Sequence, residues 1–245
     1  MAKTKKIKSI KSIKQPKIDE NQIILTDDRF RIIDGIAYPR ATFILQWYPK
    51  NEAFNRWLGN AESFDEAERI KVEAGREGSL IHRAIEDLIQ GQTLLYSDFS
   101  ETAWRKISSF VQWTKDTKPK FVKTEQVVVS KEYMYCGQYD CLAEINGELY
   151  LIDWKSGSNI FPSFWLQIAS YANALMENDF KKELPKINLA ILRLGSKHKS
   201  GYDWQVSEKS QEELFSTFIA VKHIFEAENP KLQPKEKIIS KTLNL

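Results

Sequence analysis

The sequence predicts a mixed α/β fold in which a sheet is flanked by helices. Helical patterns fill most of the first half of the chain, and strand-like and helical patterns alternate in the second half. The chain has 245 residues, of which 42% are hydrophobic. This is enough to bury a substantial core, either in one large α/β domain or in a domain with a helical appendage.

The chain opens with a lysine-rich segment, although the net charge of the whole protein is only +3. We expect residues 1–20 to form a flexible tail. A lysine arm suits contact with a polyphosphate and salt-sensitive association, but a solubilising disordered terminus has the same composition. The lysines of this segment are Lys3, Lys5, Lys6, Lys8, Lys11, Lys14 and Lys17.

Residues 21–118 are expected to form a mainly helical N-terminal part. It begins with an alternating stretch, 23–38, which is typical of a small hairpin turning at Asp34-Gly35. Several helices should follow this hairpin, ended in turn by prolines and polar loops. Apart from the longest one, they are expected over 41–47, 54–58 and 99–116.

The longest helical tract extends from Ser63 to Gln90. Ser63 should cap its N-terminus, with Glu66 completing a capping box. A glycine inside a helix costs about 1 kcal/mol relative to alanine. Gly75 and Gly78 therefore predict either a break in this tract or a close approach of another segment to its backbone.

His82 and Glu86 lie four residues apart in the second half of this tract and therefore share one face of the helix. At this spacing a His/Glu pair is more often a surface hydrogen bond than part of a ligand set. The pair becomes a candidate site only if the helix packs over the strands that follow.

Residues 119–229 are expected to form the core of the fold, in the order β-β-β-α-β-β-α. The first strand, 121–129, carries Glu125, which can face the same site as the strands after it. No regular element is expected in the C-terminal tail, 230–245. The elements after the central hairpin are a helix over 164–177, strands over 187–194 and 202–206, and a helix over 210–228.

The central hairpin is predicted by Asn146-Gly147, because both central residues of a type I′ turn need a positive φ. The turn fixes the register and places Asp140 opposite Asp153. Carboxylates that face each other directly repel. Lys155 lies on the same face as Asp153, but one ammonium group cannot balance two carboxylates.

A divalent cation would balance this pair of acids, whereas the alternative is two solvated side chains at the end of a hairpin. Residues 149–152 are apolar on both faces, which indicates a covered strand and favours the metal site. Carboxylates, a histidine and water suit Mg²⁺ or Mn²⁺ better than zinc. A metal beside an ammonium group is a constellation that fits phosphodiester hydrolysis.

Other chemistries find little support in the sequence. The only cysteines, Cys136 and Cys141, are too few for an iron–sulfur cluster, and their spacing within one strand puts the thiols on opposite faces. The chain contains neither a G-x-S-x-G elbow nor a phosphate-binding loop. No apolar stretch is long enough for a membrane span, so we expect a cytoplasmic protein without membrane contact.

Several motifs resemble those of one family. Asp140, followed by the tripeptide DWK at 153–155, resembles the signature of the PD-(D/E)XK nuclease superfamily. The segment QIASY at 167–171 resembles the Q-x-x-x-Y motif of its RecB-type exonuclease branch. The segment 78–86 resembles the upstream G-x-x-x-H-x-x-x-E helix of that branch. The resemblance covers about residues 75–194 and implies a restriction-endonuclease-like mixed central sheet flanked by helices.

The resemblance also implies roles for single residues. Lys155 would orient or activate the water, and Gln167 and Tyr171 would brace the site and contact nucleic acid. Glu86, and with it Glu125, would lie around the ligands rather than among them. The implied metal ligands are His82, Asp140, Asp153 and the backbone carbonyl of Trp154.

The sequence thus predicts a DNA exonuclease that depends on Mg²⁺ or Mn²⁺ and acts on single strands or DNA ends in replication, recombination or repair. It lacks iron–sulfur cysteines and helicase motifs, and so resembles stand-alone exonucleases of phage or mitochondrial genome maintenance. Replication or recombination proteins are candidate partners, and a phage-encoded chain would work in the host cytoplasm. Two alternatives stay open: a non-catalytic nucleic-acid-binding subunit on the same fold, and an endonuclease.

Overall fold

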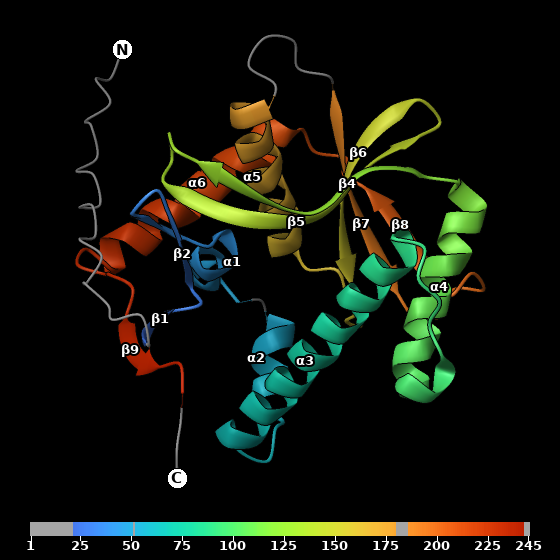
Figure 1. Ribbon diagram of the computed structural model, residues 1–245, viewed down its shortest axis with the longest axis horizontal. Helices are drawn as coiled ribbons and strands as arrows, with labels where there is room; N and C mark the ends of the chain where they lie inside the picture. The colour runs from blue at the N-terminus through green and yellow to red at the C-terminus, as the bar shows by residue number, and fades with distance from the viewer. Residues whose placement is uncertain (1–21, 51, 180–185, 243–245) are drawn as a thin grey trace.

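A mixed five-stranded sheet lies between two layers of helices in the computed structural model, which describes residues 22–50, 52–179 and 186–242 (Figure 1). The strand order is β4-β5-β6-β7-β8, and within it only β6 and β7 run parallel. This confirms the predicted α/β fold with a mixed central sheet. The strands are β4 (Lys120–Ser130), β5 (Tyr135–Ile145), β6 (Glu148–Lys155), β7 (Ile187–Leu194) and β8 (Tyr202–Val206).

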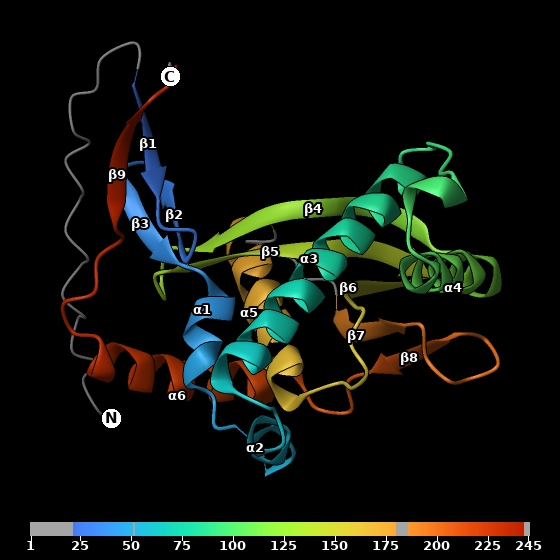
Figure 2. The ribbon, with the colours of Figure 1, turned by 90° about the horizontal axis from the view of Figure 1, so that it is seen from below.

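Helices cover both faces of this sheet (Figures 1 and 2). Side chains alternate between the faces along each strand, so neighbouring residues enter different cores. Leu151 packs in the cluster under α5 and α6, whereas Ile152 packs in the cluster under α3 and α4. Helix α5 joins the parallel strands β6 and β7, which require such a crossover. The helices are α3 (Phe64–Ile89), α4 (Glu101–Thr117), α5 (Pro162–Asp179) and α6 (Gln211–Glu228).

Helix α3 is continuous, so the predicted break near Gly75 and Gly78 is wrong. The helix-forming residues around the two glycines, together with the buried Ile81 and Ile85 that anchor the following turns, offset the cost of the glycines. Gly78 does allow the close approach that was the other expectation. A Cβ atom at Gly78 would lie 3.4 Å from Oγ of Ser156, on the loop after β6.

The N-terminus of α3 begins as the sequence predicts. Ser63 has an extended backbone, and its side chain accepts a hydrogen bond from the Glu66 N–H. The Glu66 carboxylate pairs with Arg69 at 2.7 Å. The cap is thus confirmed, while the Glu66 side chain is engaged one turn further along the helix.

The hairpin of β5 and β6 forms with the predicted turn and register. Asn146 and Gly147 have φ angles of 53° and 82°, as a type I′ turn requires. The ladder runs outward from the turn to Cys141 opposite Ile152 and ends there. Beyond this point the Asp140 side chain, instead of a ladder pair, continues the contact between the two strands.

The two ends of the described chain meet in a small separate sheet. Strand β1 (Gln22–Thr26) pairs with β9 (Glu236–Ser240), so the expectation of no regular element after residue 230 is wrong. The predicted hairpin at Asp34-Gly35 is confirmed, but it comprises only β2 (Phe30–Ile33) and β3 (Ile36–Pro39). The predicted lysine-rich tail lies outside the described residues. The remaining helical segments are α1 (Ala41–Ile44), Leu45–Trp47, α2 (Glu52–Gly59) and Tyr96–Asp98.

No helix in the described ranges of the chain is both long and apolar enough to cross a membrane.

Candidate metal centre

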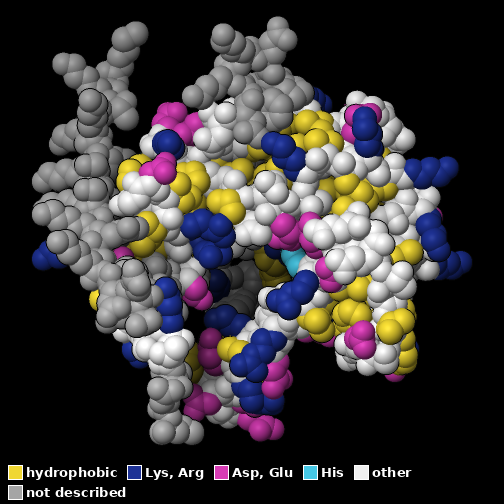
Figure 3. All heavy atoms as spheres, in the orientation of Figure 1, with side chains coloured by type: hydrophobic (Ala, Val, Ile, Leu, Met, Phe, Trp, Pro, Cys, Tyr) yellow, Lys and Arg dark blue, Asp and Glu magenta, His cyan; other side chains and the backbone are white. Residues whose placement is uncertain are grey.

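A cavity of about 940 Å³ opens beside α3, between this helix, α1 and the strands β4 to β6. The space-filling view shows a hollow on this face of the molecule, with Lys and Arg side chains around it (Figure 3). The cavity is far larger than one ion requires, so a sizeable group fits beside a metal. The polar side chains in its wall include those of Thr42, His82, Arg83, Glu125, Gln138 and Lys155.

Three side chains in or beside this cavity bring ligand atoms together. His82 on α3, Glu125 on β4 and Asp140 on β5 each offer one such atom, and these atoms all lie within 4.8 Å of one another. His82 Nδ1 is 3.3 Å from an Asp140 oxygen and 4.0 Å from a Glu125 oxygen. Helix α3 therefore does pack over the strands, which is the condition that makes His82 a candidate ligand.

The Asp140 carboxylate influences the protonation of both His82 and Glu125. Burial disfavours the charged imidazole of His82, but the carboxylates of Asp140 and Asp153 outweigh this effect and raise the pKa of His82 to about 9. Burial raises the pKa of Glu125 to about 6, and the nearby Asp140 acts in the same direction. Acidic side chains are thus concentrated at this site, and a bound cation would compensate for their negative charge.

Glu125 reaches the site through an unusual backbone conformation. Its neighbours on β4 pair with Cys141 and Tyr139, so Glu125 lies opposite Asp140. Glu125 itself has a φ angle of 49°, in the left-handed region that residues other than glycine rarely adopt. Such strain persists where the surrounding structure enforces it, and it is common at functional sites.

Gln138 holds the Glu125 carboxylate in place, a role that the sequence did not reveal. Its amide nitrogen donates to Glu125 Oε2 at 2.7 Å, and its amide oxygen accepts a hydrogen bond from Arg31 at 3.2 Å. Arg31 belongs to β2, so the N-terminal hairpin reaches the site through this chain of contacts. A glutamine and an arginine 107 residues apart carry no local signal of this link.

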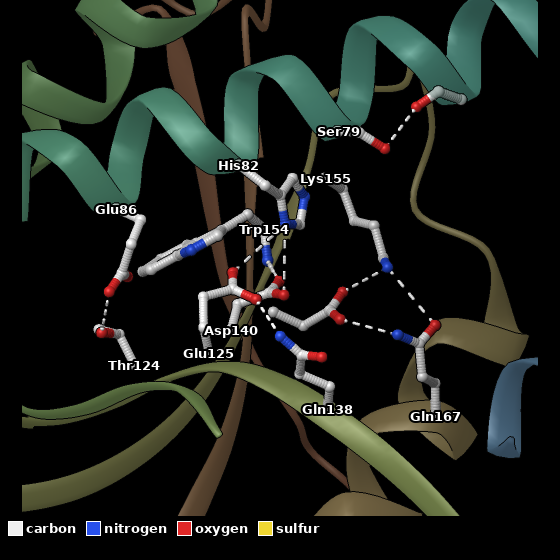
Figure 4. Close-up of polar contacts among 12 residues, drawn as sticks. Ser79, His82, Glu86, Thr124, Glu125, Gln138, Asp140, Trp154, Lys155 and Gln167 are labelled. Atoms are coloured by element: carbon white, nitrogen blue, oxygen red, sulfur yellow. Dashed lines mark hydrogen bonds and ion pairs between the residues drawn. The ribbon is translucent and has the colours of Figure 1, made fainter. Parts of the chain in front are cut away.

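Asp140 and Asp153 have different partners, and Figure 4 shows those of Asp140, which are His82 and the backbone of Trp154. The other oxygen of Asp140 accepts a hydrogen bond from the backbone N–H of Trp154 at 2.6 Å. Asp153 accepts a hydrogen bond from the Gln167 amide at 3.0 Å and forms an ion pair with Lys155 at 2.6 Å. The two aspartates are therefore near one another but are not the direct cross-strand pair that the sequence predicts.

Lys155 lies between Asp153 and the aromatic ring of Phe164. Its Nζ is 4.3 Å from the centre of that ring and 3.5 Å from the Gln167 amide oxygen. Burial raises the pKa of Asp153, and the Lys155 ammonium opposes this effect. The ion pair leaves Asp153 Oδ2 without a hydrogen bond of good geometry in the described part of the chain.

Two further predicted residues, Glu86 and Tyr171, are not among the three clustered ligands. Glu86 accepts hydrogen bonds from Thr124 and Gln90, both at 2.9 Å, and does not pair with His82. Tyr171 is only 3% exposed, and its ring lies against Gly137, where a Cβ atom would come within 2.1 Å of it. The ring is thus buried against the sheet, and the contact of Tyr171 with nucleic acid and its bracing role both stay predictions.

The residues present fit a divalent cation. One imidazole nitrogen and several carboxylate oxygens form a ligand set that suits Mn²⁺ and Mg²⁺. Their mutual distances allow a single ion to contact all of them after small side-chain rotations, and the negative charge of the cluster favours binding. His82, Glu125 and Asp140 are the residues that can hold the ion. Ligation by Asp153 and by the Trp154 carbonyl stays a prediction.

Comparisons with known proteins assign no family. No family model and no curated protein matches the sequence. The fold is similar to the crystal structure of a candidate exonuclease from Eubacterium rectale, with a TM-score of 0.42 and 11% identity over 66% of this chain and 70% of the other. It is also similar to the protein SSO0001, with a TM-score of 0.28 and 9% identity over 64% of this chain and 87% of the other. At these scores neither neighbour assigns an activity to this chain.

Proposed function

We propose that this protein is a divalent-metal-dependent deoxyribonuclease that degrades DNA from its ends. The observation that carries the proposal is that possible metal ligands and a lysine ammonium group lie at the same cavity. His82, Glu125 and Asp140 gather ligand atoms within 4.8 Å of one another, and Lys155 lies next to them on Asp153. The motifs that resemble the RecB-type exonuclease branch support the same activity.

Each part of the site has a task in phosphodiester hydrolysis. A bound Mg²⁺ or Mn²⁺ would lower the pKa of a water molecule and offset the negative charge of the phosphate. The Lys155 ammonium faces the cavity and stabilises the additional negative charge that develops on the attacked phosphate. Gln167 and Asp153 fix the position of this ammonium by direct contacts. Gln138 fixes Glu125 in the same way on the other side.

The experiment is digestion of end-labelled single- and double-stranded DNA with Mg²⁺, with Mn²⁺ and with EDTA. We expect hydrolysis with either metal, none with EDTA, and a severe loss for Lys155→Ala. The matched control is Lys115→Ala, which removes an exposed lysine from α4. Equal activity of the wild type and Lys155→Ala would refute the assignment.

Covalently closed circular DNA separates an exonuclease from an endonuclease. An enzyme that requires ends leaves such circles intact and digests the same molecule after linearisation. Cleavage of closed circles would refute the exonuclease proposal and support the endonuclease alternative. Binding of DNA without hydrolysis under any metal would instead identify a non-catalytic nucleic-acid-binding subunit.

A further inference from the structure

The exposed side of α3 carries two arginines next to the metal centre. Arg83 lines the cavity that contains His82, and it also lines a second, adjoining cavity together with Arg76. Arg76 and Arg83 are seven residues apart, so they lie on the same side of the helix, about 10 Å apart along its axis. Both side chains belong to exposed residues.

These two arginines have no ion-pair partner among the described residues, unlike most arginines of the chain. Two acids near Arg76 in the sequence are engaged elsewhere, Glu73 with Arg69 at 2.8 Å and Glu77 with Lys106 at 2.6 Å. Glu86, one turn after Arg83, accepts hydrogen bonds from Thr124 and Gln90. Two guanidinium groups are therefore free to bind an anion.

Open space lies beside the arginines on this side of α3. Gly75 and Ser79 line both cavities, and no described atom outside the neighbouring helix backbone and chain neighbours lies within 4 Å of the position that a Cβ of Gly75 would occupy. An extended ligand can therefore pass along this side of α3 from the metal centre. Planar guanidinium groups match phosphate oxygens in geometry and charge, and arginine is the preferred residue for such contacts.

We propose that Arg76 and Arg83 bind consecutive stretches of the phosphodiester backbone of a single nucleic-acid strand whose end lies at the metal centre. This inference rests on the proposed function, since it takes the metal centre as the place of hydrolysis. We call the surface formed by Gly75, Arg76, Ser79 and Arg83 the α3 track. It positions the strand by charge and does not read its sequence.

The test is the salt dependence of binding, measured by fluorescence anisotropy in EDTA so that the strand stays intact. The probe is a labelled oligothymidylate of about 20 nucleotides, longer than the site of one small binding fold. Each phosphate contact to a single strand contributes about 0.7 to the slope of log K against log salt. The double variant R76A/R83A should therefore reduce the magnitude of this slope by about 1.4. If the binding curves of the variant and the wild type converge near 1 M salt, this change corresponds to about 25-fold weaker binding of the variant at 100 mM salt.

Two variants separate charge from fold. R76K/R83K keeps both charges and should keep the slope of the wild type. Arg105→Ala removes an arginine from α4 that is 75% exposed and pairs with Glu101, so it should leave the slope unchanged. The α3 track would be overturned if the wild type did not bind the strand at low salt. It would also be overturned if R76A/R83A kept the slope of the wild type, whether or not its binding were weaker.

The outcome is independent of the proposed hydrolysis. Binding with the predicted loss of slope, but no digestion of DNA by the wild type with Mg²⁺ or Mn²⁺, would refute the nuclease and leave the α3 track in place. Digestion by the wild type together with an unchanged slope in R76A/R83A would support the nuclease and refute the α3 track.

Discussion

Asp140 and Asp153 lie on neighbouring strands of one hairpin, yet their carboxylates interact with different kinds of partner. Asp153 is surrounded by the protein's own partners, the Lys155 ammonium at 2.6 Å and the Gln167 amide at 3.0 Å. Asp140 instead shares its surroundings with a second carboxylate, that of Glu125, and with the imidazole of His82.

This difference divides the site into two halves with separate requirements. In the Asp153 half, the Lys155 ammonium pairs with the carboxylate at 2.6 Å. The Asp140 half gathers two carboxylates, and the positively charged form of His82 is favoured beside them. We therefore expect metal affinity to depend on the Asp140 half, and the charge that faces the phosphate to come from the Asp153 half.

The largest effect is expected for Asp140→Asn. It removes the carboxylate shared by the ligand cluster, while an amide oxygen can still accept the hydrogen bond from the Trp154 N–H. Mn²⁺ binding should be lost and hydrolysis should fall by about 10³-fold, measured by calorimetry and by release of labelled nucleotides. The matched control is Asp116→Asn, which changes an exposed residue of α4. Retention of both metal binding and hydrolysis in Asp140→Asn would contradict the division into halves.

Lys155→Ala should separate the two halves. We expect kcat to fall by about 10²–10³-fold, because a preorganised charge at the phosphate is lost. Mn²⁺ affinity should not decrease, since Lys155 compensates Asp153 and none of the clustered ligand atoms. Titration calorimetry with Mn²⁺ measures this directly. A parallel loss of metal affinity would show that the two carboxylates act as one ligand set.

Gln138→Ala should weaken the metal half alone. It removes the amide that donates to Glu125 at 2.7 Å, and outer hydrogen-bond partners of metal ligands are worth about 10–100-fold in affinity. We expect an Mn²⁺ dissociation constant raised within this range, with full activity restored at saturating metal. Gln112→Ala on α4 serves as the control. An unchanged dissociation constant in Gln138→Ala would exclude this role of Gln138.

A smaller effect is expected from pH. Burial opposes the charge on His82, but Asp140 and Asp153 prevail and raise its pKa to about 9, so the metal-free protein holds an imidazolium at neutral pH. A metal ligand must be the neutral imidazole, so Mn²⁺ has to displace this proton. Affinity should thus rise by about ninefold between pH 7 and 8 and by about 50-fold in total between pH 7 and 9, because half of His82 has lost its proton at pH 9. Calorimetry in buffers of different ionisation enthalpy should show release of about one proton, and binding without proton release would contradict the assignment of His82.

The contacts of the site that local sequence specifies could be predicted. Asn146-Gly147 favours one turn type, and this turn determines the register of β5 and β6 as far as Cys141 and Ile152. The position of Lys155 beside Asp153 follows from the two-residue period of a strand. The ladder ends before Asp140, because the side chain of Asp140 takes the Trp154 N–H itself.

Other contacts of the site join segments that are far apart in the sequence, and no local pattern predicts them. Glu125 enters the ligand cluster through a φ angle of 49°, although nothing in its residue type requires a left-handed conformation. Gln138 and Arg31 meet only after folding. Strand β9 was not predicted for the same reason, because it pairs with β1 at the other end of the described chain. The glycines of α3 were misleading because their local cost is offset by tertiary packing.

Pulsed electron paramagnetic resonance of the Mn²⁺-loaded protein tests the central claim most directly, because it detects nitrogen bound to the ion. If His82 joins the carboxylates as a ligand, the wild type shows ¹⁴N coupling of an imidazole, and His82→Gln abolishes it although His198 and His223 are still present. A wild-type spectrum without nitrogen coupling, or a coupling that survives in His82→Gln, would contradict the metal centre described above.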